Sequence, residues 1–214
     1  MSGVNTYLFA LTISPVQSFI SQARTTRDLY AGSAILSWLM AKALSIDELK
    51  TETVILLQNK EAVSNKLVVK LSNNDPEKIG QKLKQLIQNE LYRIGSKTVV
   101  SFPKITINTQ FFKENIQTQL CGYFQVYWVA VRLNNNYNTS YGLLERNLAA
   151  VKNLRQFKQL SQESGKKCSV CGERNGLFYN QDKIPKHIIK NAIRIQDSQL
   201  KENEILCAVC FAKR

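Results

Sequence analysis

The chain has 214 residues, which suits one domain of about 150 residues and a smaller module, and its 44% hydrophobic share is ordinary for a globular protein. Its 29 Lys and Arg against 16 Asp and Glu give a formal charge of +13, which favours polyanionic partners, with nucleic acid ahead of a membrane surface. Dispersed basic residues exclude a basic tail, and no apolar run approaches the roughly 18–20 residues of a membrane span. The first residues lack the features of a signal peptide, so we expect a cytoplasmic protein without membrane contact.

The first half of the chain predicts a strand followed by two helices. Residues 6–13 are apolar and rich in β-formers, which indicates a buried strand. Ser14-Pro15 fits an N-cap followed by a proline at the first helical position. A second helical stretch is expected after Gly32-Ser33, with Ile35, Leu36, Leu39, Met40 and Ala43 on one face.

The rest of the chain, from residue 53 on, predicts further strands and helices. Two short strands are expected at 53–58 and 66–71, and Asp75-Pro76 opens an amphipathic helix that runs to about Tyr92. Residues 95–121 look polar and irregular, with a short strand near 104–108. Residues 123–133 give the strongest strand pattern, and a helix is expected over 141–162.

This element order predicts the fold class. Strand, helix, strand, strand, helix, strand is the split βαβ pattern of an α+β, ferredoxin-like domain. A change of composition at 161–167 marks the start of a different module. We therefore expect a ferredoxin-like domain over 1–162 and a zinc-binding module with a helical insertion over 163–214.

Two Cys-x-x-Cys pairs supply the metal signal, Cys168 with Cys171 and Cys207 with Cys210. In a reducing compartment such pairs indicate metal binding rather than disulfides. A spacing of two residues lets both thiolates reach one ion from a tight turn, which Gly172 would help to form. Two such knuckles complete a tetrahedron without an open position, so we expect a structural Zn²⁺ site. The alternative is two unrelated cysteine pairs.

Two other residues could take part in metal chemistry. Cys121 precedes an apolar strand and is expected to be a packed thiol. His187, the single histidine, lies between the knuckles and is expected at the surface rather than as a ligand.

Catalytic motifs are missing from the sequence. A single histidine argues against a multi-histidine nuclease and against Ser-His-Asp catalysis. The sequence has neither a P-loop nor a Gly-Gly-Asp-Asp turn, and Ser14-Pro15 follows the first strand where two-metal phosphoryl transfer needs a carboxylate. We expect no catalysis by this chain alone.

The segment from Ser14 to Trp38 resembles the opening of the large subunit of type III-B (Cmr) CRISPR effector complexes. The matching features are Pro-Val-Gln-x-Phe-Ile from Pro15, Ala-Arg-x-Thr-Arg-Asp-Leu from Ala23, and the Gly-Ser step at Gly32. The knuckles also follow the first palm-like domain as in that family, and Lys213-Arg214 follow the last knuckle. The resemblance covers essentially the whole chain, but it is weak between residues 50 and 160.

The resemblance implies an RNA-guided antiviral assembly. The family's large subunit has two ferredoxin-like palms, of which the second makes cyclic oligoadenylates from ATP, and a nuclease domain that cleaves single-stranded DNA. This chain matches the first palm and the zinc module and lacks the motifs for both activities. The implied partners are the other Cmr-type subunits, guide RNA, target RNA and a companion polypeptide that carries the second palm. The implied cofactors are structural Zn²⁺ and ATP at the interface between the palms.

The same segment contains the candidate nucleotide-binding residues Arg24, Thr25, Arg27, Asp28 and Ser33. An arginine could meet a phosphate near a helix N-terminus that begins at Ser33. The alternative is that the Arg–Asp pair only fixes a local turn. Two other functions stay open: a free-standing zinc-ribbon nucleic-acid-binding protein, supported by the charge, and an active cyclase or nuclease, against which the missing motifs argue.

Overall fold

The computed structural model describes residues 6–55, 65–72, 74–101, 110–154, 165–179, 193–194, 200–201 and 203–214. The chain divides into two compact units. Unit 1 comprises Met1–Val16, Ile35–Ile87 and Phe124–Phe157, and unit 2 comprises Gln17–Ala34, Gln88–Tyr123 and Lys158–Arg214. Unit 2 thus combines two earlier segments of the chain with the segment that contains the cysteine pairs. The domain boundary that the sequence predicts between residues 162 and 163 stays a prediction. No helix in these described ranges is long and apolar enough to span a membrane.

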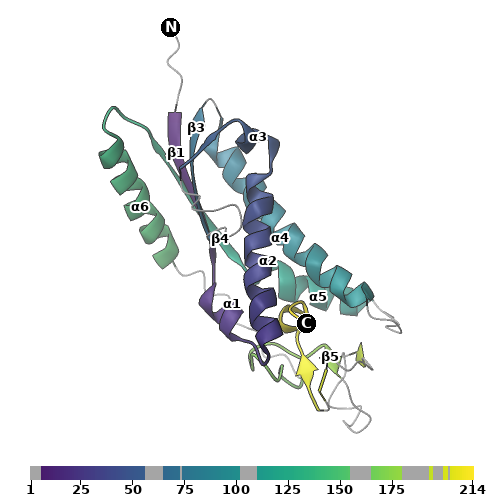
Figure 1. Ribbon diagram of the computed structural model, residues 1–214. Coiled ribbons are helices and arrows are strands. Elements are labelled where there is room, and N and C mark those ends of the chain that lie inside the picture. Colours follow the sequence, from purple (N-terminus) through teal and green to yellow (C-terminus); the bar gives the residue numbers. More distant parts are fainter. Residues whose placement is uncertain are drawn as a thin grey trace. The chain divides into compact units, whose positions relative to one another are not determined.

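Unit 1 is built on a four-stranded antiparallel sheet with the order β2-β3-β1-β4 (Figure 1). The strands are β1 (Thr6–Ser14), β2 (Thr53–Val54), β3 (Lys66–Ser72) and β4 (Gln125–Arg132). Strand β1 is central and is fully buried from Leu8 to Leu11, which explains its continuous apolar run without alternation. The α+β class and the strands predicted near 6–13, 66–71 and 123–133 are confirmed.

Helices cover both faces of this sheet (Figure 1). On one face, α6 (Tyr137–Asn153) packs Leu144 and Leu148 against Leu8, Ala10 and the β3–β4 residues of the same face. On the other face, Trp128 of β4 stacks on Phe9 at 5.9 Å between ring centroids and lies against Gly80 of α4 (Pro76–Ser101). Helix α3 (Asp47–Lys50) precedes β2.

We expect Gly80→Ala to lower the free energy of unfolding by about 1–3 kcal/mol because the core there has no room for a methyl group. A Cβ at this position would lie 2.3 Å from the indole ring of Trp128, which the stacked Phe9 restrains. Urea unfolding measures the change. The matched control is Gly142→Ala on the exposed side of α6, where nothing lies within 4 Å. It should gain about 0.5–1 kcal/mol from helix propensity, and equal effects at both glycines would contradict the packing.

The start of α2 (Thr26–Leu44) differs from the sequence expectation. The helix begins before Gly32-Ser33, because Thr25 and Asp28 form a reciprocal capping box. The Asp28 amide donates to Thr25 Oγ1 at 3.2 Å, and the Thr25 amide donates to Asp28 Oδ2 at 3.3 Å. Ser33 therefore lies inside a helix rather than at its N-terminus. The apolar face predicted for 35–43 is buried as expected.

Other boundaries also shift. Ser14 still pairs with Gln125 in the sheet, and α1 (Gln17–Ser21) begins two residues after Pro15, so the predicted cap and first helical position there are wrong. Part of the stretch 95–121 that looked irregular is helical, because α4 continues to Ser101 and α5 occupies Gln110–Cys121. The expected strand near 104–108 lies outside the described residues.

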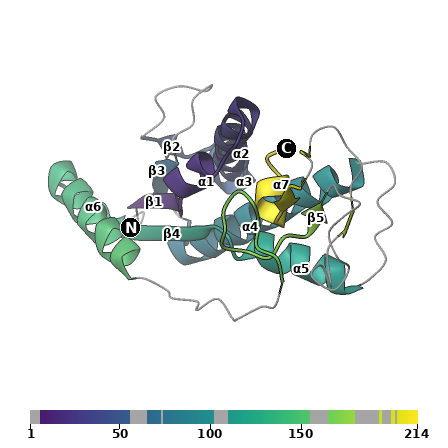
Figure 2. The ribbon, with the colours of Figure 1, turned by 90° about the horizontal axis from the view of Figure 1, so that it is seen from below.

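Unit 2 contains α1, α5, the small sheet β6-β5-β7 and the short helix α7 (Ala208–Phe211). Strand β5 (Phe178–Tyr179) pairs parallel with β6 (Ile193–Arg194) and antiparallel with β7 (Ile205–Leu206). Figure 2 shows α7 close to α5. The rings of Phe178 and Phe211 stack at 3.9 Å and form the centre of this small core.

Candidate metal centre

The first cysteine knuckle is a tight turn held by backbone hydrogen bonds. The Cys168 amide donates to the Arg174 carbonyl at 2.8 Å, and the Gly172 amide donates to the Cys168 carbonyl at 2.9 Å. Gly172 has a φ of +68°, a left-handed conformation that glycine adopts without steric cost. The turn that the sequence predicted at this glycine is confirmed, and it places both thiols on the same side of the loop.

The second knuckle opens α7. Cys207 is the N-cap of this helix, and its sulfur accepts from the Cys210 amide at 3.4 Å. The two knuckles are joined through β7, since the Ser169 amide donates to the Ile205 carbonyl at 2.8 Å and the Ile205 amide donates to Ser169 Oγ at 3.0 Å. The backbone thus brings the knuckles together although about 35 residues separate them in the sequence.

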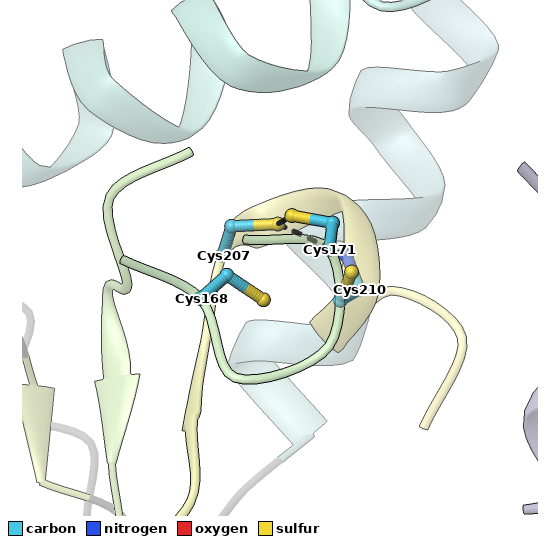
Figure 3. A group of neighbouring side chains, drawn as sticks. All are labelled: Cys168, Cys171, Cys207 and Cys210. Atoms are coloured by element: carbon cyan, nitrogen blue, oxygen red, sulfur yellow. Dashed lines mark hydrogen bonds between the residues drawn. The ribbon is translucent and has the colours of Figure 1, made fainter. Parts of the chain in front are cut away.

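The four sulfur atoms converge between the first knuckle and the start of α7 (Figure 3). All four lie within 4.8 Å of one another, and the sulfurs of Cys171 and Cys207 are 3.8 Å apart. Zinc–sulfur bonds of about 2.3 Å in a tetrahedron require sulfur–sulfur separations of about 3.8 Å. Three of the cysteines are buried and Cys171 is partly buried, so the donor set and the spacing fit a closed Zn²⁺ site.

The thiols also need a cation to ionise together. Hydrogen bonds from the neighbouring thiols, that of Cys168 first, hold the pKa of Cys171 well below its usual range. Hydrogen bonds with Cys168 and Cys171, in that order, together with burial, raise the pKa of Cys207 and of Cys210. The hydrogen bond with Cys171 raises the pKa of Cys168, but those with Cys207 and Cys210 lower it, to about 6. The four thiols therefore ionise unequally, and a bound divalent ion would allow all four to ionise.

Partly or fully buried polar groups contact the segments that contain the cluster. Gln119 of α5 joins both knuckle segments, because its Nε2 donates to the Asn175 carbonyl at 3.0 Å and its Oε1 accepts from the Ala208 amide at 2.8 Å. The side chain of Lys213 is 1% exposed. Burial lowers the pKa of Lys213, while the nearby cysteines, Cys210 first, act in the opposite direction. The guanidinium of Arg174 lies 4.6 Å over the Tyr123 ring.

The candidate nucleotide-binding residues differ in accessibility. Arg24, Arg27 and Ser33 are exposed, whereas Asp28 is 3% exposed. Asp28 Oδ2 accepts from the Arg24 and Thr25 amides, and the Arg24 guanidinium donates to the Ser169 carbonyl at 2.7 Å. Arg24, Thr25 and Asp28 thus build the local turn that the sequence offered as an alternative, while Arg27 and Ser33 lie exposed on α2.

The remaining residues that the sequence singled out are Cys121, His187, Lys166 and Lys167. Cys121 ends α5, where burial raises the pKa of its thiol. His187 and the expected helical insertion lie outside the described residues. Lys166 and Lys167 are exposed beside the first knuckle, as a basic contact surface requires.

Sequence reasoning missed the residues that support the centre. Gln119 and Lys213 occupy positions that no local sequence motif marks. Their partners are distant in sequence, so only the folded chain identifies them. A buried lysine directly after a knuckle gives no signal that distinguishes it from a surface lysine.

Comparisons with known proteins place the chain in a family. Residues 8–120, more than half of the chain, match the family described as CRISPR-associated protein Cmr2, N-terminal. No curated protein matches the chain.

Two solved structures share its fold. The chain is similar to one in type III-B Cmr-beta in the apo state, with a TM-score of 0.66 and 16% identity over 98% of this chain and 31% of that one. A chain of type III-B Cmr-beta bound to cognate target RNA gives a TM-score of 0.60 and 14% identity over 99% of this chain and 32% of that one. This chain therefore spans about a third of the length of each of the two chains that it matches. Taken with the match over residues 8–120, the chain belongs to the family of the N-terminal region of CRISPR-associated protein Cmr2.

Proposed function

We propose that this chain is a non-catalytic portion of the large subunit of a type III-B CRISPR RNA-guided effector, where it contributes to complex assembly and to a nucleotide-binding palm interface. The observation that carries the proposal is the family match over residues 8–120, which contains the whole segment from Ser14 to Trp38. The likeness in fold to two Cmr-beta chains supports it.

The sheet supports a ferredoxin-like palm. The chain runs β1, α1, α2, α3, β2, β3, α4, α5, β4, and the strands assemble in the order β2-β3-β1-β4 with every pairing antiparallel. This succession agrees with the split βαβ arrangement, in which the first strand is central and the last strand pairs beside it. In this proposal, unit 1 contains the palm, and the four-cysteine cluster holds one structural zinc ion.

A nucleotide such as ATP would bind where this palm meets a second palm on a companion polypeptide. Among the five candidates, Arg27 and Ser33 are exposed and free to approach a phosphate from α2. Arg24, Thr25 and Asp28 would act by shaping the turn that precedes the helix. The other Cmr-type subunits, guide RNA and target RNA complete the proposed set of partners.

Assembly gives the direct test of this proposal. The purified chain, mixed with the remaining Cmr-type subunits and guide RNA, should co-elute with them in size-exclusion chromatography. In the assembled sample, Arg27→Ala should weaken ATP binding, whereas Arg146→Ala, which removes an exposed arginine of α6, should not. A chain that never co-elutes under these conditions would refute the proposal.

A second function is favoured by the net charge of +13 and by exposed Lys166 and Lys167 beside the first knuckle. A free-standing zinc-ribbon protein would bind bare RNA or DNA with an affinity that falls steeply with salt, because phosphate contacts release counterions. Failure to co-elute together with such salt-sensitive binding would favour this second function.

A further inference from the structure

The turn between α1 and α2, residues 22–25, contacts both cysteine knuckles. On the side of the first knuckle, the Arg24 guanidinium donates to the carbonyl of Ser169, which lies between the two cysteines of that knuckle, at 2.7 Å. Gln22 Nε2 donates to Glu173 Oε1, two residues after Cys171, at 3.0 Å. Two side chains of the turn therefore bind the first knuckle from outside the metal cluster.

Lys213 makes the contact on the side of the second knuckle, three residues after Cys210. Its ammonium donates to the Phe19 carbonyl at 2.7 Å and to the Gln22 carbonyl, and it lies 4.9 Å over the Phe19 ring. These carbonyls belong to the end of α1, where a helix leaves acceptors without intrahelical donors. The aliphatic part of Lys213 lies 3.5 Å from the position that a Cβ of Gly32 would occupy.

The two sets of contacts depend on the relative position of the knuckles. Four thiolates carry more negative charge than one divalent ion neutralises, so the bound cluster would also stabilise the buried Lys213 ammonium. A metal ion that binds all four sulfurs holds Ser169 and Lys213 at the two places from which the turn is bound.

We infer that the metal centre fixes the shape of the α1–α2 turn, with Arg24, Gln22 and Lys213 as the positioning residues. The inference rests on the proposed zinc site and goes beyond it, because it assigns the ion a role in a segment that contains no ligand. Coupling of this kind is reciprocal, so the same contacts should slow the release of zinc.

Hydrogen exchange measured by mass spectrometry reports on this turn. The amides of residues 22–25 are all hydrogen-bonded: Gln22 to Ser18, Ala23 to Ser21, and Arg24 and Thr25 to Asp28. In the zinc-loaded full chain, Lys213→Met should retain one zinc ion and should raise exchange of these amides about tenfold to a hundredfold, the effect of losing a charged hydrogen bond. Zinc release to a chelator should accelerate by a similar factor.

Two further variants keep the test decisive. Lys166→Met replaces an exposed lysine near the first knuckle and should leave both exchange and release unchanged. Arg24→Met alters an exposed side chain, so it should fold even if Lys213→Met does not, and it should raise both rates. Zinc-loaded Lys213→Met or Arg24→Met with wild-type exchange would overturn this inference alone. If the wild-type protein is well folded and contains no zinc, both this inference and the proposed zinc site are wrong.

Discussion

Cys207→Ser should abolish stoichiometric zinc binding and unfold unit 2. Cys207 is fully buried, caps α7 and places its sulfur 3.8 Å from that of Cys171. A serine hydroxyl stays protonated and cannot replace a thiolate ligand. Zinc binding contributes about 10–16 kcal/mol to the folding of zinc-finger peptides, which equals or exceeds the whole stability of a typical domain. Elemental analysis measures the zinc, and thermal unfolding by circular dichroism measures the loss of structure.

The matched control is Cys121→Ser, the same chemical change at a half-buried cysteine outside the cluster. This variant should keep one zinc ion per chain and should lose about 1 kcal/mol or less of stability. Wild-type protein that is well folded without zinc would contradict the four-cysteine site. Full zinc content and unchanged unfolding in Cys207→Ser would contradict it equally, since only three sulfur ligands would remain.

The sequence predicted those parts of the fold that depend on local patterns. The continuous apolar run of β1 and the apolar face of α2 both reflect burial that repeats along a single element. The sequence predicts the beginning of α2 too late, because Gly32-Ser33 resembles a helix boundary. The capping box of Thr25 and Asp28, with aspartate where glutamate or glutamine is usual, lies about two turns earlier.

In the candidate site, too, a local pattern predicts some residues and only tertiary contacts reveal the others. Cys-x-x-Cys spacing is a local pattern, so all four members of the cysteine cluster could be named from the sequence. The contacts around the cluster join residues far apart in the chain, such as Gln119 with Ala208 and Lys213 with Phe19. Glutamine and lysine are common on surfaces, and only the folded chain shows that Lys213 is buried and that Gln119 joins the two knuckle segments. Asp28 shows the same limit, because only the folded chain reveals that it is buried and accepts from the Arg24 and Thr25 amides.

We expect Arg214→Leu to lower the free energy of unfolding by about 3–5 kcal/mol, because it leaves two buried carboxylates without their cation. Arg214 Nη2 donates to Glu204 Oε1 at 2.6 Å, and its Nε lies 3.5 Å from Asp28 Oδ1. The three side chains are 7%, 1% and 4% exposed, so water screens these charges weakly. Chemical denaturation of the zinc-loaded chain measures the loss.

A second substitution separates the charge effect from lost packing. Glu204→Gln in the Arg214→Leu background removes one of the two uncompensated charges and should restore part of the stability, because the amide oxygen can still accept from the Lys201 amide. Arg146→Leu, at an exposed arginine of α6, should change stability by less than about 0.5 kcal/mol. A loss below about 1 kcal/mol in Arg214→Leu would mean that Asp28 and Glu204 are neutralised by other means. Without recovery in the double variant, the loss in Arg214→Leu would instead reflect packing of the arginine side chain rather than its charge.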